Sequence, residues 1–159
     1  MTVARHHHWI GGRQFIPKNE KYFEDLNPLD DSLYAEIAEG DPADVAMAVE
    51  TAHASFGSYR HSLPKQREAW LLRAAELLEN RSSQFIDTLI DEVGSPILKA
   101  QREVETSVGI LRSAAGATRQ LAGKTLPTDV PGRLSMSIRR PLGVIAGISP
   151  FNVPLIKNI

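Results

Sequence analysis

The stretch RPLGVIAGISPFNVPL, residues 140–155, decides the fold class of this 159-residue chain. Its run over residues 144–148 is apolar on both faces of an extended backbone, which is typical of a central strand in a parallel sheet covered on both sides. Open α/β sheets bind ligands beyond the carboxyl ends of such strands. The sequence therefore predicts an α/β fold with a candidate site at the residues after the strand, Ser149, Pro150, Phe151 and Asn152.

The segment before this stretch predicts a strand of a different kind. Residues 134–139 alternate apolar and polar side chains, as a strand with one buried face does. A long helix precedes it, beginning after Ser95-Pro96. Gly109 and Gly116 each weaken this helix by about 1 kcal/mol relative to alanine, so they are expected to permit close approach of a neighbouring element. The apolar side chains predicted to lie on its buried face are Ile97, Ala100, Val104, Val108, Leu111 and Ala115.

Three further helices are predicted upstream. Asp41 is a good N-cap and Pro42 suits the first helical position, so one helix runs from there to about Phe56. A second begins near Pro64, and a third covers residues 83–93 before the stop at Gly94. Spacings of three and four predict core faces formed by Val45, Val49, Ala52 and Phe56 in the first helix and by Trp70, Leu71, Ala74, Leu77 and Leu78 in the second.

The first forty residues read as short strands joined by turns. Gly11-Gly12 is the signature of a tight hairpin turn, because both central positions need positive φ. A second strand pair is expected over residues 22–26 and 33–38. His6-His7-His8 cannot close a tetrahedral metal site, because adjacent strand residues point to alternating faces. A solvated or tag-like terminus with no metal is expected there.

Composition excludes several classes of partner. The chain is 42% hydrophobic and 23% charged, with a net charge of -1 and a pI near 6.5. A net charge this close to zero does not favour the binding of nucleic acid or of anionic lipid. With no signal peptide and no apolar run that could span a bilayer, a cytoplasmic protein without membrane contact is expected. The absence of cysteine excludes a thiol nucleophile within these residues.

The stretch Arg140 to Leu155 resembles the P-L-G-V-x-x-x-I-x-P-[WF]-N-x-P-L block of the aldehyde dehydrogenase superfamily. Ile10-Gly11-Gly12, Asn27-Pro28 and the Gly123 to Pro127 segment follow in the order that family shows. The resemblance implies the α/β aldehyde dehydrogenase fold, in which N-terminal β-hairpins and helices lead into the first strand of a Rossmann-like sheet, here incomplete. It divides the chain into a hairpin and helical part of the cofactor domain (1–122), an oligomerisation strand segment (123–140) and the first strand with its active-site loop (141–159).

The resemblance also assigns roles to the candidate site. Asn152 matches the asparagine that stabilises the oxyanion, whereas an asparagine between prolines, taken alone, is more often a turn residue. Ile148, Ser149, Pro150 and Phe151 match positions that line the NAD or NADP site near the nicotinamide. Phe151 replaces the tryptophan of many members.

In this family the catalytic cysteine, the general-base glutamate and the pyrophosphate-binding turn lie beyond the position of Ile159. The chain is therefore expected to be a truncated, inactive N-terminal portion of a parent that oxidises an aldehyde to a carboxylate through a cysteine thioester. The stretch over residues 128–136 resembles the benzaldehyde, vanillin and salicylaldehyde branch, and the parent is expected to be a dimer or tetramer. Two alternatives stay open: a non-catalytic assembly module, and an acylating semialdehyde dehydrogenase that uses coenzyme A.

Overall fold

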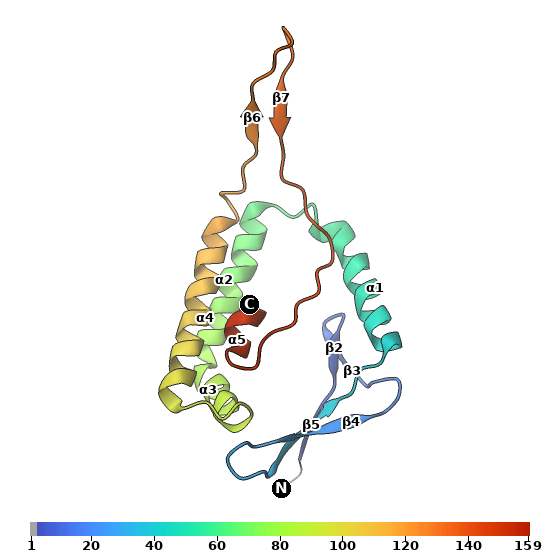
Figure 1. Cartoon of the computed structure of the whole chain (residues 1–159), viewed down its shortest axis with the longest axis vertical. Coiled ribbons are helices and arrows are strands. Elements are labelled where there is room, and N and C mark those ends of the chain that lie inside the picture. Colours follow the sequence, from blue (N-terminus) through green and yellow to red (C-terminus); the bar gives the residue numbers. More distant parts are fainter. Residues whose placement is uncertain (1–2) are drawn as a thin grey trace.

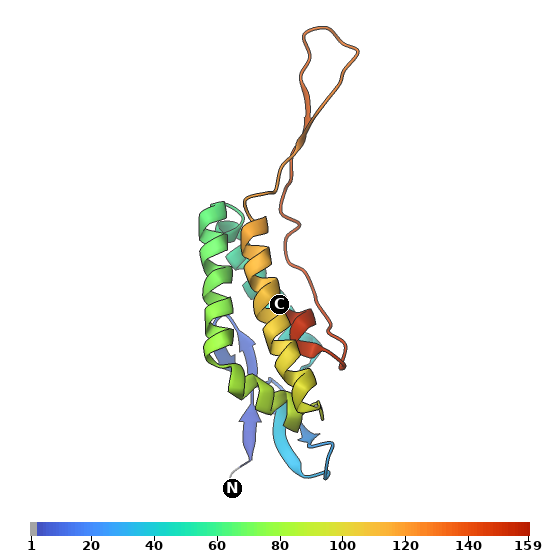
Figure 2. The ribbon, with the colours of Figure 1, turned by 90° about the vertical axis from the view of Figure 1, so that its left-hand side faces the viewer.

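The computed structural model describes residues 3–159 as a helical body with β elements at its two ends. The strands are Ala4–His6 (β1), His8–Ile10 (β2), Arg13–Phe15 (β3), Tyr22–Leu26 (β4), Leu33–Ala38 (β5), Lys124–Leu126 (β6) and Ser135–Ser137 (β7), and the helices are Pro42–Tyr59 (α1), Pro64–Asn80 (α2), Ser82–Asp91 (α3), Ile97–Ala117 (α4) and Pro154–Asn158 (α5). Helices α2, α3 and α4 pack together, while the β6–β7 hairpin projects beyond them (Figures 1 and 2). None of the helices within residues 3–159 is long and apolar enough to cross a membrane.

The N-terminal strands form two small sheets. β2 and β3 pair antiparallel around Gly11 and Gly12, whose φ angles of 62° and 77° are the positive values that the tight turn requires. β4 and β5 also pair antiparallel, over the bounds that the sequence predicts. Both hairpins are therefore confirmed, and β1 joins β5 as a parallel neighbour that the sequence pattern does not indicate.

The expectation of a solvated or tag-like histidine run holds for His6, which is exposed, but is wrong for His7 and His8. His7 Nδ1 lies 2.8 Å from the Tyr22 hydroxyl oxygen, and His8 Nε2 lies 3.6 Å from Asp44 Oδ2. Both rings are half-buried, because the strands place them against β4 and the start of α1. Within residues 3–159, no three His, Asp or Glu side chains are grouped so that they could hold a metal ion.

A reciprocal cap begins α1, as the sequence predicts. The Asp41 carboxylate accepts hydrogen bonds from the backbone N–H groups of Ala43 and Asp44, at 2.7 and 2.9 Å, and Asp44 accepts one from the Asp41 N–H in return. Asp44 is buried and also accepts from the Lys18 N–H at 3.2 Å. Burial alone would raise the pKa of Asp44, but these hydrogen bonds and the charges of His8 and Lys18 outweigh it and hold the pKa below its usual value.

The apolar face of α1 is not the core face that its periodicity predicts. Val45 and Val49 are 61% and 48% exposed, and the helix continues past the expected end at Phe56 to Tyr59. Figure 1 shows α1 standing apart from α2 and α4, so no element within the described residues covers this face. Periodicity identifies a face suited to burial but carries no information about what will cover it.

The core lies where α4 packs against α2 and α3. The predicted stripe of α4 is confirmed except at Ile97, which is exposed at the start of the helix. Trp70 is also exposed and stacks on the Tyr59 ring, with 5.7 Å between centroids, so its assignment to the core is wrong. The buried core consists of Ala75, Leu78, Leu89, Ala100, Val104, Val108 and Leu111.

The two glycines of α4 do not have the role that the sequence predicts. A Cβ added at Gly109 or Gly116 would meet nothing within 4 Å among the described residues, so the expected close approach at these positions is wrong. Such an approach occurs instead at Gly123, where a Cβ would lie 1.8 Å from the Ser137 carbonyl oxygen. The stop at Gly94 is confirmed by its φ of 67°.

The two predicted C-terminal strands have different outcomes. The strand expected over residues 134–139 forms only as β7, which pairs antiparallel with β6. The strand expected over residues 144–148 is not formed. A strand needs a neighbour to receive its backbone hydrogen bonds, and within residues 3–159 no strand lies beside this segment.

We expect Gly109→Ala to raise the free energy of unfolding of the chain by about 1 kcal/mol, because alanine favours the helix and its methyl group has open space. Urea denaturation followed by circular dichroism measures this change. Gly132→Ala is the matched control: that position is also open, but its φ of 76° disfavours alanine, so stability should fall. A loss of stability in Gly109→Ala would show that a neighbouring group occupies the space.

Asp44→Asn is expected to lower stability at neutral pH, because the hydrogen bonds around Asp44 favour the charged carboxylate. The folded pKa of Asp44 lies below its ordinary value of 3.8, so the contribution of the charge is complete above that value and is lost as pH falls through the folded pKa. Denaturation curves of wild type and variant at several pH values test this. The stability difference should stay constant from pH 7 down to about 4 and then close; a constant difference at all pH values would contradict it.

Candidate functional site

The five predicted site residues lie on the chain segment that returns from β7 toward α4. This segment passes along one side of α4 and turns into α5, which lies beside α4 (Figures 1 and 2). Ile148 is 99% exposed and Phe151 is 88% exposed. Phe151 and Asn152 form the turn that leads into α5. The structure therefore brings the five residues together as one exposed loop rather than as the end of a sheet strand.

The loop is closed on itself by one side-chain contact. The Ser149 hydroxyl donates a hydrogen bond to Asn158 Oδ1, at 2.7 Å. Because Asn158 is the last residue of α5, this bond ties the start of the loop to the end of the helix. Asn152 lies within the closed segment, and among the described residues its carboxamide has no hydrogen-bond partner. That carboxamide is free to donate to a ligand.

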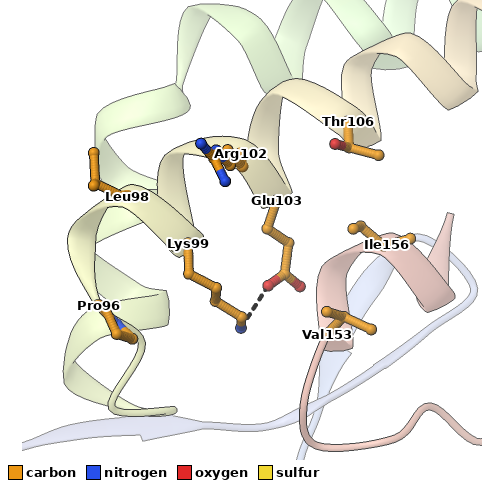
Figure 3. A pocket seen from close by; sticks show the side chains of 8 residues that line it. All are labelled: Pro96, Leu98, Lys99, Arg102, Glu103, Thr106, Val153 and Ile156. Atoms are coloured by element: carbon orange, nitrogen blue, oxygen red, sulfur yellow. Dashed lines mark ion pairs between the residues drawn. The ribbon is translucent and has the colours of Figure 1, made fainter.

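Two charged residues that the sequence reasoning missed lie next to this loop. Glu103 Oε1 accepts a hydrogen bond from the backbone N–H of Leu155, at 2.9 Å. Glu103 is only 2% exposed, and its Oε2 lies 2.7 Å from Lys99 Nζ (Figure 3). The sequence does contain a signal for this ion pair: Glu103 is a charged residue within the apolar stripe of α4, and Lys99 lies one helical turn before it.

A cavity of about 390 Å³ lies between α4 and α5 (Figure 3). Two of its charged groups, Lys99 and Glu103, form an ion pair, Arg102 is a third charged group in the lining, and Val153 and Ile156 supply apolar surface from the α5 side. The cavity is therefore the joint between the two helices, and the loop residues 148–152 do not line it.

The loop residues can supply part of a dinucleotide site. The exposed apolar side chains of Ile148 and Phe151 are suited to contact a flat ring, which matches the nicotinamide end of NAD or NADP. The pyrophosphate of such a cofactor needs backbone N–H groups at a glycine-rich turn, and no G-x-G-x-x-G occurs in this sequence. The residues present therefore fit one wall of the cofactor site.

The model of the aldehyde dehydrogenase family matches residues 15–158, nearly the whole chain. The chain belongs to the aldehyde dehydrogenase family. The match includes the loop with Asn152 and the helices that support it, so the predicted fold class is confirmed.

Individual aldehyde dehydrogenases extend this similarity. A vanillin dehydrogenase from Pseudomonas sp. is 37% identical over 94% of this chain and 31% of its own length. A crystal structure of a salicylaldehyde dehydrogenase from Pseudomonas putida G7, complexed with salicylaldehyde, superposes with a TM-score of 0.85 at 28% identity, over 88% of this chain and 29% of that one. The crystal structure of an NAD-dependent benzaldehyde dehydrogenase from Corynebacterium glutamicum superposes with a TM-score of 0.76 at 31% identity, over 80% of this chain and 28% of that one. The chain thus spans about a third of the length of these enzymes.

The exposed apolar side chains after β7 predict self-association of the 159-residue chain. Leu142 and Ile145 are exposed on a segment without strand partners, and such surface favours contact between copies. We expect Leu142→Ser/Ile145→Ser to lower light scattering of the purified chain by about twofold or more. Leu29→Ser, at an equally exposed leucine in the turn between β4 and β5, is the control and should change little. A monodisperse wild-type chain would contradict the prediction.

Proposed function

We propose that the protein containing this chain oxidises an aromatic aldehyde to a carboxylate with NAD or NADP, and that Asn152 stabilises the oxyanion formed on the way. Family membership supports the reaction class. The observation that carries the residue assignment is the position of Asn152: it lies in the turn before α5 with an exposed carboxamide that no described residue engages.

The chemistry explains why an amide is useful at this position. When a nucleophile adds to an aldehyde carbon, the carbonyl oxygen becomes an oxyanion, which a positioned N–H donor stabilises where water is excluded. The Asn152 carboxamide carries two such donors and no charge that titrates near neutral pH. A bound NAD or NADP would accept the hydride from the substrate carbon. Ile148 and Phe151 would exclude water from one side of the reacting groups.

The nucleophile must come from outside these residues, since the chain contains no cysteine. The resemblance assigns a cysteine, a general-base glutamate and a pyrophosphate-binding turn to later parts of the family sequence. We infer that this chain contributes the oxyanion donor and one wall of the cofactor site. The substrate class follows the named relatives, since vanillin, salicylaldehyde and benzaldehyde dehydrogenases all take their names from ring-bearing aldehydes.

A homo-oligomer is part of the same proposal. The β6–β7 hairpin projects away from the helices and exposes Leu126, Met136 and Ile138 (Figure 1). An isolated two-stranded hairpin is marginally stable in water, so a second copy that covers these side chains would stabilise it. This supports a dimer or tetramer of the complete protein.

The test is an assay of the complete protein with benzaldehyde and with propanal, following NADH formation. We expect the aromatic substrate to be preferred and Asn152→Ala to lower kcat by about 10²–10³. Asn80→Ala, at an exposed asparagine at the end of α2, is the matched control and should retain wild-type kcat. The 159-residue chain alone should form no NADH.

An Asn152→Ala variant with wild-type kcat would remove the oxyanion assignment while leaving the reaction class in place. A preference for propanal would overturn the aromatic substrate class. Steady NADH formation by the 159-residue chain would show that the nucleophile lies within it.

A further inference from the structure

Helix α5 lacks a cap of its own. The residue before it is Val153, whose side chain has no hydrogen-bonding atom, and its first residue is Pro154, which has no N–H. The first free backbone donor of the helix is therefore the N–H of Leu155. Such donors at helix starts need an acceptor, and a helix of one turn has few internal bonds to compensate for an unmade one.

Glu103 supplies that acceptor from 52 residues earlier in the chain. Its Oε1 lies 2.9 Å from the Leu155 nitrogen. Its Oε2 lies 2.7 Å from Lys99 Nζ, and Lys99 in turn donates to Ser95 Oγ at 2.8 Å. One carboxylate oxygen thus accepts a hydrogen bond from the α5 backbone, and the other forms an ion pair with Lys99 on α4 itself (Figure 3).

Packing of α4 alone does not explain a carboxylate at this position, because burying its charge costs free energy. Glu103 is 2% exposed and lies beside Ala100 and Val104 on the buried face of α4. Replacing a buried ion pair by apolar side chains of similar size is often neutral or stabilising. The contact that an apolar residue could not reproduce is the hydrogen bond to the Leu155 N–H.

We propose that Glu103 is a positioning residue for the reaction: it fixes the first turn of α5 and thereby sets the direction of the Asn152 carboxamide, three residues before Leu155. This rests on the proposed function of Asn152. The Ser149–Asn158 hydrogen bond closes the other side of the loop, and the Leu155 side chain packs against the helical core. With both ends of the loop tied, Asn152 can present its amide without making a contact of its own.

The kinetic test compares Glu103→Ala and Glu103→Gln in the complete enzyme with benzaldehyde and NAD. Alanine removes the acceptor, and a misplacement of about 1 Å can cost about 10²-fold in rate, so we expect kcat to fall by about 10- to 100-fold with KM for NAD little changed. Glutamine keeps a carbonyl oxygen for the Leu155 N–H and should retain kcat within about threefold of wild type. Glu105→Ala, at an exposed glutamate of the same helix, is the matched control.

Hydrogen–deuterium exchange of the peptide covering residues 153–158 tests the anchoring without any activity. We expect exchange to accelerate by about tenfold or more in Glu103→Ala and to stay at the wild-type rate in Glu103→Gln and Glu105→Ala. Wild-type exchange or wild-type kcat in Glu103→Ala would overturn the proposal. So would an equal loss of kcat in Glu103→Gln. If the wild-type protein oxidises no aldehyde, the proposed function fails and the positioning role with it, while the exchange result still decides whether Glu103 anchors α5.

Discussion

Burial of the apolar stripe of α4 against α2 and α3 is the interaction on which the rest of this structure depends. Val104, Val108 and Leu111 belong to the core cluster that α4 forms with α2 and α3. Their burial fixes the rotation of α4 about its axis, because a helix that buries one stripe has a single orientation against its neighbours. Glu103 lies on this buried face, so the same packing aims its carboxylate at α5.

Local signals predicted the elements well. The Asp41 cap, the Gly11-Gly12 turn and the stop at Gly94 each depend on residues close together in sequence, and all three are confirmed. The α4 stripe is confirmed for a related reason: one continuous helix satisfies its periodicity with a partner helix inside the same chain. These features require no knowledge of distant segments.

Two of the failures, the core face of α1 and the strand over residues 144–148, share a physical cause. Val45 on α1 and the apolar run over residues 144–148 have patterns that call for burial, but no described element covers them. The candidate loop itself follows from the family resemblance of residues 140–155, whereas its anchor could not be predicted, since it joins residues 52 positions apart. The available clue was Glu103, a charged residue inside the apolar stripe of α4. Its partner is a backbone N–H, and because every residue except proline has one, the sequence does not identify which of them it is.

The most direct test of the central claim is a crystal structure of the complete protein with NAD and an aromatic aldehyde bound. The claim is that this chain presents Asn152 to the reacting carbonyl. It predicts that Asn152 Nδ2 lies about 3 Å from the aldehyde oxygen, with Glu103 still bonded to the Leu155 N–H. A structure in which the Asn152 carboxamide turns back to cap its own loop, while another group donates to that oxygen, would contradict it.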